Sequence, residues 1–233
     1  MISAVIVAGG KGQRMGGALA KQYLLLDGFP VLTRTLLAFA ELGSVDRICL
    51  VVPSTDLAYC RREILPPVGE GLRVDLVPGG ETRQQSVYNG LSALPEFSGI
   101  VIIHDGVRPF VPIHPTRTAI SHAEKHGACI LGIPLTDTLK SVDRAGDISE
   151  TMPRRDLWQA QTPQVFALDL IKKAHDRAVA EKFSGTDDAS LVEKFGGRVR
   201  MIYGSPYNIK ITTPEDMVIA RGILCVCGES GVN

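Results

Sequence analysis

Short apolar runs alternate with helical patterns along nearly the whole chain, and this alternation limits the possible folds more than any other feature. Mostly apolar runs with the length and composition of buried strands occur at 2–8, 48–52, 74–77, 100–103 and 128–134. Between them, apolar residues recur at helical spacing at 32–43, 82–94 and 114–126. Because strands that alternate with helices form parallel sheets covered on both faces, the sequence predicts an α/β fold. We expect one doubly wound, mostly parallel, Rossmann-like sheet.

In the second half of the chain, predicted helices and strands continue to alternate, with one interruption. Helices are predicted near 168–181, 187–195 and from Thr213 onward, and strands at 198–203 and 208–212. The interruption is Leu135–Asp156, where polar and apolar residues alternate around a turn at Arg144–Asp147 and so predict a β-hairpin. A hairpin of this length cannot bury itself, so it packs on the core or on another subunit. We expect one domain, 1–233, with a protruding arm at 135–156.

Charge and cysteine content exclude several kinds of partner. Lys plus Arg and Asp plus Glu both number 25, so no net field favours nucleic acid or an anionic membrane. The five cysteines lack the spacing of a metal site or a redox pair. The first residues, MISAVIVAGG, have no basic segment, and their apolar run is too short for a signal or a membrane helix. We therefore expect a cytoplasmic protein that binds neither nucleic acid nor membrane.

The opening strand runs into a glycine-rich segment, AGGKGQRM, which is followed by Lys21. It is not a Rossmann fingerprint, because Met15 stands where the third glycine belongs, nor a Walker A loop, because Ala20 and Gln22 flank Lys21. Glycines nevertheless let backbone N–H groups approach an anion, and Arg14 and Lys21 suit phosphate oxygens. The segment predicts a phosphate-binding loop. The alternative is a strand-ending turn whose cations face water.

Three polar segments follow buried strands and are expected to meet. Ala8–Gly10, Gly79-Gly80 and Asp105 each come directly after a strand, and ligands of doubly wound sheets bind at the carboxyl ends of the strands. A carboxylate such as Asp105, placed near cations that bind phosphates, suits Mg²⁺. Read by itself, Asp105 is equally compatible with an ordinary turn residue.

Seven motifs, in order and in register, carry a resemblance to a known family. They are AGGKGQRM…KQY (8–23), GGETRQQSV (79–87), HDGVRPFV (104–111), PLTDTLK (134–140), LWQAQTPQVF (157–166), TDDASLVEKFG (186–196) and NIKITTPEDM (208–217). Together they resemble the 2-C-methyl-D-erythritol 4-phosphate cytidylyltransferases of the non-mevalonate isoprenoid pathway, within the sugar-phosphate nucleotidyltransferases. The resemblance covers essentially the whole chain.

The resemblance implies a reaction between CTP and methylerythritol 4-phosphate that gives the CDP-linked polyol and pyrophosphate. The phosphate of the polyol attacks the α-phosphorus of CTP, so catalysis depends on positioning and on charge neutralisation. The catalytic residues implied by the family pattern are Arg14, Lys21, Arg154 and Lys210. Asp105 would bind Mg²⁺. His104 is expected to be a core or supporting residue rather than a base, because the nucleophile is already ionised.

The resemblance also assigns binding residues. Those implied for CTP are Ala8, Gly9, Gly10, Gly80, Glu81, Arg83, Ser86 and Asp105. Those implied for the polyol phosphate are Asp105, Arg108, Thr138, Arg154, Thr162, Thr186 and Lys210. Lys210 alternates with Ile209 and Ile211 and is predicted to lie on a central strand, facing away from them. Without the family, an edge-strand lysine in water would be the simpler interpretation.

In the resembling family the arm crosses a two-fold axis and completes the pocket of the partner subunit. A homodimer in which Thr138 and Arg154 act on the partner's substrate is therefore implied. On the residues alone, the segment is equally compatible with an exposed hairpin whose charges face water.

Two departures from the family pattern leave the substrate open. Ala20 replaces a proline that usually precedes Lys-Gln-Tyr, and Ala8-Gly9-Gly10 replaces Ala-Ala-Gly, as in ribitol-5-phosphate cytidylyltransferases. HDGVRPF and QAQTPQ lean toward the ribitol enzymes, whereas TDTLK and TDDASLVEKFG favour the methylerythritol enzymes. A further alternative is a nucleotide-binding module that has lost turnover. It is disfavoured because Arg14, Lys21, Asp105 and Lys210 are all present.

Overall fold

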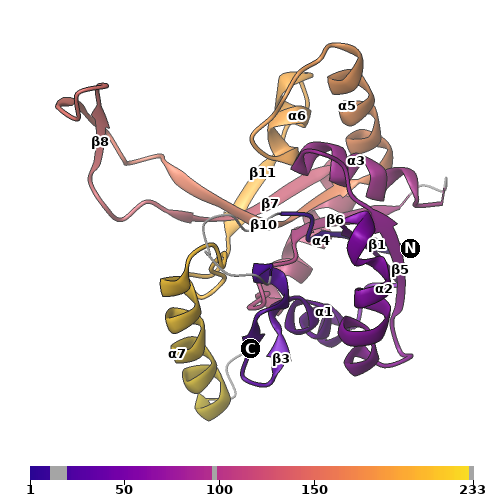
Figure 1. Cartoon of the computed structure of the whole chain (residues 1–233). Coiled ribbons are helices and arrows are strands. Elements are labelled where there is room, and N and C mark those ends of the chain that lie inside the picture. Colours follow the sequence, from indigo (N-terminus) through magenta and orange to yellow (C-terminus); the bar gives the residue numbers. More distant parts are fainter. Residues whose placement is uncertain (11–19, 96–98, 231–233) are drawn as a thin grey trace.

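The computed structural model describes residues 1–10, 20–95 and 99–230, with the backbone alone for 227–230. A seven-stranded sheet crosses its centre in the order β11-β7-β10-β6-β1-β4-β5 (Figure 1). β10 runs antiparallel to both its neighbours, and the other pairings are parallel, which confirms the predicted mostly parallel sheet. The strands are β1 (Ile2–Val7), β4 (Arg47–Val52), β5 (Arg73–Pro78), β6 (Ile100–Asp105), β7 (Ala128–Pro134), β10 (Trp158–Ala167) and β11 (Arg200–Tyr203).

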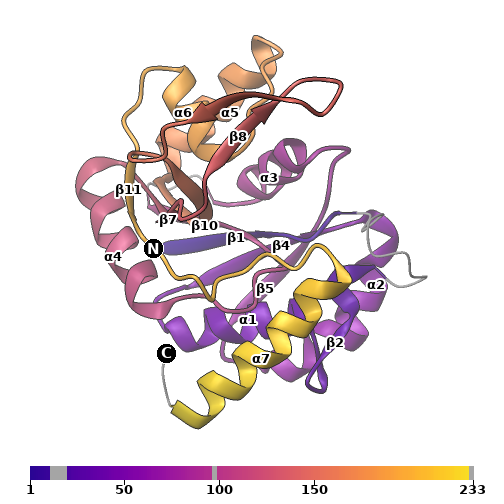
Figure 2. The same ribbon diagram turned by 90° about the vertical axis from the view of Figure 1, so that its left-hand side faces the viewer.

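Helices cover both faces of the sheet. Side chains of β1 show why: Ala4 and Ile6 pack into one apolar cluster and Val5 and Val7 into another, because successive residues of a strand point to opposite faces. Figure 2 shows α3, α5 and α6 on one side of the sheet and α1, α2 and α7 on the other. The helices are α1 (Val31–Leu42), α2 (Leu57–Tyr59), α3 (Arg83–Ser92), α4 (Ile113–His126), α5 (Leu168–Ala180), α6 (Asp188–Lys194) and α7 (Pro214–Ser230). No helix in the described part of the chain is long and apolar enough to cross a membrane.

Two helix ends follow directly from the sequence. The Thr82 hydroxyl accepts a hydrogen bond from the backbone N–H of Gln85 and so caps the start of α3. Gly43 ends α1 in a left-handed conformation, with φ of 67°, which glycine adopts without strain. The cap at Thr82 matters for function because it fixes where Arg83, the first residue of α3, leaves the turn after β5.

The predicted arm is present and projects from the body of the molecule (Figure 1). Strands β8 (Leu139–Val142) and β9 (Ile148–Met152) pair only with each other, outside the central sheet. At the predicted turn, the carboxylate of Asp143 accepts hydrogen bonds from the N–H groups of Ala145 and Asp147. Val142, Ile148 and Met152 are exposed on the arm. The role of the arm in dimerisation stays a prediction.

The strands of the structure differ from the predicted ones at three places. The strand expected at 208–212 is wrong: this segment is irregular, and Ile211 N–H donates one hydrogen bond to Val107 C=O without forming a ladder. The alternation within it holds, because Ile211 is buried and Lys210 points to Asp105. Conversely, β10 was not predicted. Glutamines and a proline are uncommon in a central strand, so the sequence did not indicate one here. In the structure, the side chains of Gln161 and Gln164 are buried and hydrogen-bonded. A small hairpin, β2 (Leu25–Leu26) with β3 (Phe29–Pro30), was also not predicted.

Candidate active site

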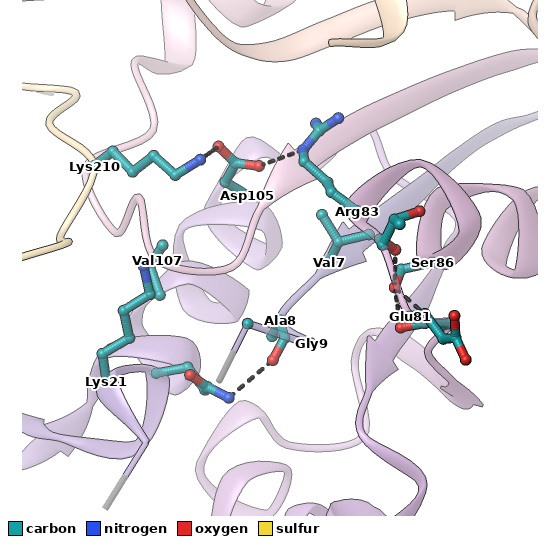
Figure 3. Close-up of a pocket in the computed structure, with 14 residues that line it drawn as sticks. Val7, Ala8, Gly9, Lys21, Glu81, Arg83, Ser86, Asp105, Val107 and Lys210 are labelled. Atoms are coloured by element: carbon teal, nitrogen blue, oxygen red, sulfur yellow. Dashed lines mark hydrogen bonds and ion pairs between the residues drawn. The ribbon is translucent and has the colours of Figure 1, made fainter. Parts of the chain in front are cut away.

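A cavity of about 560 Å³ opens at the carboxyl ends of β1, β5 and β6 (Figure 3). Figure 3 shows Lys21 and Lys210 along one side and Arg83, Ser86 and Glu81 along the other. All the residues that the sequence predicts for CTP line this cavity. Among the described residues, the lining consists of Val7, Ala8, Gly9, Gly10, Lys21, Gln22, Gly80, Glu81, Thr82, Arg83, Ser86, Asp105, Val107 and Lys210.

Asp105, the last residue of β6, lies among three cationic side chains at the cavity. Its Oδ1 accepts from Nε of Arg83 at 3.0 Å, and its Oδ2 lies 2.8 Å from Nζ of Lys210 and 3.5 Å from Nε of Arg108. Burial would raise the pKa of Asp105, but these three cations, Arg83 first, hold it well below its usual range. Arg83 also pairs with the carboxylate of Asp188, so these three cations and two carboxylates leave one positive charge in surplus, which suits phosphate groups.

The residues after Lys21 hold this lysine at the cavity. Lys21 begins a short 3₁₀ helix, Lys21–Tyr23, at the end of the glycine-rich segment. The buried side chain of Gln22 donates to the backbone carbonyl of Ala8 at 2.9 Å, and the hydroxyl of Tyr23 donates to Asp56 at 2.8 Å. The first bond joins the two ends of the glycine-rich segment, and the second anchors Tyr23 to the segment after β4. Arg14, a predicted catalytic residue, lies outside the described residues.

The turn between β5 and α3, residues 79–82, forms a wall of backbone groups and hydroxyls in which Glu81 is the one charged residue. The hydroxyl of Ser86 accepts from Gly80 N–H at 3.1 Å and donates to Thr82 C=O at 2.9 Å. A Cβ on Gly79 would lie 3.3 Å from this hydroxyl and 3.4 Å from Val52 C=O, so glycine allows the close approach. Backbone groups and a hydroxyl of this kind can read the edge of a nucleobase.

His104 supports the site from within the core. Thr162 Oγ1 accepts from Asp105 N–H at 3.1 Å, so its own proton is directed to Nδ1 of His104, also 3.1 Å away. Nε2 of His104 then donates to Arg108 C=O at 3.0 Å. Burial lowers the pKa of His104 to about 4. The ring is therefore neutral near pH 7 and holds the backbone on both sides of Gly106, which agrees with the predicted supporting role.

Several residues predicted for the polyol phosphate lie outside this cavity. Thr162 is buried against backbone, and Arg108 donates from Nη1 to Asn208 C=O at 2.7 Å, beneath Asp105. Thr138, Arg154 and Thr186 are exposed, and Arg154 donates to the carbonyl of Thr136 within the base of the arm. Of the predicted polyol residues, the structure brings only Asp105 and Lys210 to the cavity wall.

Two buried residues next to the cavity were not predicted to take part. Asp188, at the start of α6, accepts from Nη1 of Arg83 at 2.8 Å, and His175 of α5 lies 3.2 Å from Asp188. Asp188 belongs to the quoted motif TDDASLVEKFG, yet nothing in its spacing shows that it is buried against Arg83.

Of the two predicted carboxylates at the cavity, Glu81 and Asp105, only Asp105 lies among the cations expected to bind phosphates, so the fit is tested on Asp105. Among the described residues, no group of three His, Cys, Asp or Glu side chains could hold a metal. Mg²⁺ at a nucleotide is commonly held by one or two carboxylates, with phosphates and water completing the shell. The ionised Asp105 at the cavity fits such a single ligand. A cation there would compete with Lys210 for Oδ2.

The fold and the cavity together define a class of protein. The glycine-rich end of β1, the turn after β5 with its backbone groups and hydroxyls, and the surplus of cations around Asp105 form an α/β site of the nucleotidyltransferase type. Such a site holds a nucleoside triphosphate at the carboxyl edge of the sheet.

Comparison with known proteins identifies the family within this class. The family model described as IspD, 2-C-methyl-D-erythritol 4-phosphate cytidylyltransferase, matches residues 2–225. Relatives with that name from Syntrophotalea carbinolica and Geotalea uraniireducens are 46% and 43% identical. The matches cover 97% of both chains for the first and 96% of both for the second. The crystal structure of a 4-diphosphocytidyl-2C-methyl-D-erythritol synthase from Anaerococcus prevotii aligns with a TM-score of 0.83 at 33% identity. That alignment covers 96% of this chain and 98% of the other. The chain belongs to the 2-C-methyl-D-erythritol 4-phosphate cytidylyltransferase family.

Proposed function

We propose that this protein transfers the cytidylyl group of CTP to 2-C-methyl-D-erythritol 4-phosphate, giving 4-diphosphocytidyl-2-C-methyl-D-erythritol and pyrophosphate. The observation that carries the proposal is the cavity itself, where the residues expected for CTP meet two lysines and an ionised aspartate. Membership of the family names the substrates.

The chemistry fits a direct displacement. A phosphate oxygen of the polyol forms a bond to the α-phosphorus of CTP, while the bond from that phosphorus to the bridging oxygen of pyrophosphate breaks. No proton has to be removed from the nucleophile, since it is an ionised phosphate. Lys21 can follow the negative charge that moves onto pyrophosphate, and Lys210 can orient the attacking phosphate.

The experiment that tests the function is an assay of pyrophosphate release from CTP, with methylerythritol 4-phosphate and ribitol 5-phosphate compared side by side. We expect the methylerythritol substrate to give the higher kcat/KM. A preference for ribitol 5-phosphate would contradict the proposed substrate, and no pyrophosphate with either would favour a binding module. The comparisons do not favour the ribitol alternative.

We also propose that Mg²⁺ or a similar divalent cation is required, with Asp105 as its protein ligand. The ion would neutralise charge on the phosphates of CTP. Asp105→Asn keeps the shape but removes the charge that a hard cation needs, so turnover should fall on the order of 10²-fold, as for loss of one electrostatic group. Turnover should also stop in excess chelator. The control is Asp27→Asn, because Asp27 is exposed and outside the cavity. Full turnover without a divalent cation would contradict the requirement.

A homodimer and a cytoplasmic location are further parts of the proposal. Support for the dimer comes from the arm, whose apolar residues Val142, Ile148 and Met152 are exposed. Support for the location comes from the thiols of Cys49, Cys60 and Cys129, which are buried and unpaired as in a reducing compartment.

A further inference from the structure

Behind the cavity, α5 and α6 bury a hydrogen-bonded pair of titratable side chains. His175 and Asp188 have side chains 0% and 1% exposed, and Nε2 of His175 lies 3.2 Å from Oδ1 of Asp188. Neither residue lines the cavity. The pair nevertheless reaches the cavity through one further side chain, Arg83 of α3.

Arg83 joins this buried pair to the centre of the site. Its Nη1 donates to Oδ2 of Asp188 at 2.8 Å, and its Nε donates to Oδ1 of Asp105 at 3.0 Å. A continuous chain of contacts therefore runs from His175 through Asp188 and Arg83 to Asp105 and on to Lys210. Figure 3 shows the last part of this chain at the cavity wall.

The geometry of the guanidinium gives Asp188 a role beyond charge balance. A guanidinium is planar and its donors are fixed relative to one another, so an anion held at Nη1 determines which nitrogen meets a second anion. With Asp188 in place, Arg83 presents its Nε edge to Asp105. Without Asp188, the guanidinium of Arg83 is free to turn and to donate to Asp105 through both of its terminal nitrogens. Arg83 and Lys210 would then compete for Oδ2 of Asp105, which only Lys210 approaches closely in the structure.

His175 in turn holds Asp188. Of the two carboxylate oxygens, Oδ2 bonds to Arg83 and Oδ1 to His175, so the ring supplies the partner that keeps the carboxylate from rotating. A buried carboxylate that loses a partner is costly and tends to rearrange. Burial would raise the pKa of Asp188, but Arg83 and His175 hold it below its usual range.

We propose that His175 and Asp188 are positioning residues for the transfer reaction. They fix the orientation of Arg83 and, through it, the carboxylate of Asp105 at the phosphate end of the cavity. This inference rests on the proposed function, and it adds two residues that do not touch the cavity. The competing explanation is that the pair only packs the core, where His175 also stacks on Tyr88 with ring centroids 6.2 Å apart.

A double-mutant cycle separates these explanations. If His175 acts through Arg83, His175→Leu should lower kcat/KM for CTP by about tenfold in the wild-type background, the lower end for supporting partners of a site. In the Arg83→Ala background it should have almost no further effect, because the residue through which it acts is gone. His175→Gln should restore most of the activity, since the amide can donate near the position of Nε2.

Ile171→Ala is the matched control for packing. Ile171 is fully buried on the same helix, one turn before His175, and its side chain has no polar group that could take part in the charge chain. Its truncation should lower the melting temperature at least as much as His175→Leu, because it leaves a cavity, yet leave kcat/KM unchanged well below that temperature.

Two outcomes would overturn the inference. Equal losses from His175→Leu with and without Arg83 would assign the pair to general packing. So would a crystal structure of His175→Leu in which Arg83 keeps both contacts unchanged, a result that needs no activity. If His175→Leu fails to fold, Asp188→Asn, which keeps the shape of the side chain, replaces it in both experiments. A wild-type chain with no transfer activity would contradict the proposed function instead, and the crystal structure would still decide the inference.

Discussion

At the residue scale, the cationic side chains of the cavity are the groups expected to stabilise charge on the phosphates, and Lys210 gives the clearest test of this role. It lies 2.8 Å from Asp105 at the wall of the cavity, and Lys21 lies on the same side (Figure 3). Lys210→Ala and Lys21→Ala should each lower kcat on the order of 10²- to 10³-fold while changing the Kd of CTP less than about tenfold. The reason is that their charge matters most when negative charge moves in the transition state. Steady-state kinetics and calorimetric titration with CTP measure the two effects.

The control for this prediction is Lys125→Ala, since Lys125 is an exposed lysine on α4, away from the cavity. It should leave both kcat and the Kd unchanged. Near-normal turnover in either cavity variant would show that the lysine does not stabilise the transition state. A loss that appears only in the Kd would make it a ground-state binding residue.

His104 gives stability a defined pH dependence. Its pKa is lowered to about 4 by burial, whereas the unfolded chain has the ordinary value of about 6.5. Between these values the unfolded state takes up a proton that the folded state does not, so the free energy of unfolding falls as the pH falls from 6.5 toward 4. The loss should reach about 3 kcal/mol. Urea denaturation of the wild type and of His104→Gln across this range measures it.

The glutamine variant can still donate to Arg108 C=O but does not titrate. Its stability should therefore be flatter with pH than that of the wild type, and the difference between the two curves isolates His104 because both proteins have the same carboxylates. Parallel curves for the two proteins would show that the buried ring is not the group responsible.

The contact between α3 and the sheet is the critical packing contact at the element scale, because α3 carries Arg83 and Ser86. A Cβ on Gly90 would lie 2.5 Å from Cγ1 of Val5 and 3.0 Å from Cγ2 of Val51, so any larger residue pushes α3 off the sheet. Gly90→Ala should lower the free energy of unfolding by about 1–3 kcal/mol, as other overpacked sites do, although alanine is the better helix former. Urea denaturation measures the change.

Gly222 of α7 provides the matched control. A Cβ there meets nothing within 4 Å, so only helix propensity changes. Gly222→Ala should raise the free energy of unfolding by about 0.5–1 kcal/mol. If both substitutions stabilised the protein, the close approach of α3 to β1 would not be a constraint on this fold.

Elements that depend on local signals could be predicted from the sequence, and those that depend on tertiary partners could not. Thr82 and Gly43 mark the ends of α3 and α1 through their own backbone chemistry. β10 escaped prediction because Gln161 and Gln164 look solvent-facing until their buried partners, Ser205 and Asp187, are known. The wrong strand at 208–212 shows the converse: alternation gave the correct side for Lys210 but not its pairing.

The candidate site likewise contains residues that the sequence could predict and residues that it could not. The glycine-rich segment, the turn at Gly80 and Asp105 follow strands, and the carboxyl edge of a parallel sheet brings such ends together. His175 and Asp188 could not be found this way, because they reach Arg83 only through the packing of α5 and α6 on α3.

At the scale of the whole molecule, the arm holds two predicted substrate residues away from the cavity of its own chain. Thr138 and Arg154, which the family pattern assigns to the substrate, are exposed and do not line the cavity of their own chain. The arm that carries them projects from the body in Figure 1. We expect a second copy of the chain to bring these residues to the cavity, in a two-fold arrangement where each arm completes the site of its partner.

Mixing inactive subunits tests this shared site. Arg154→Ala and Lys21→Ala chains should each be nearly inactive, because every site of either homodimer lacks one residue. After subunit exchange at equal amounts, half the dimers are mixed and each holds one intact site, so activity should return to about a quarter of the wild-type value. The matched control mixes Lys21→Ala with Lys210→Ala: both residues lie in the body, no mixed dimer regains an intact site, and no activity should return. Full activity of a monomer, or no recovery with Arg154→Ala despite proven exchange, would show that the arm does not act on the partner's site. Recovery in the control would show that Lys21 and Lys210 do not act together in the site of one chain.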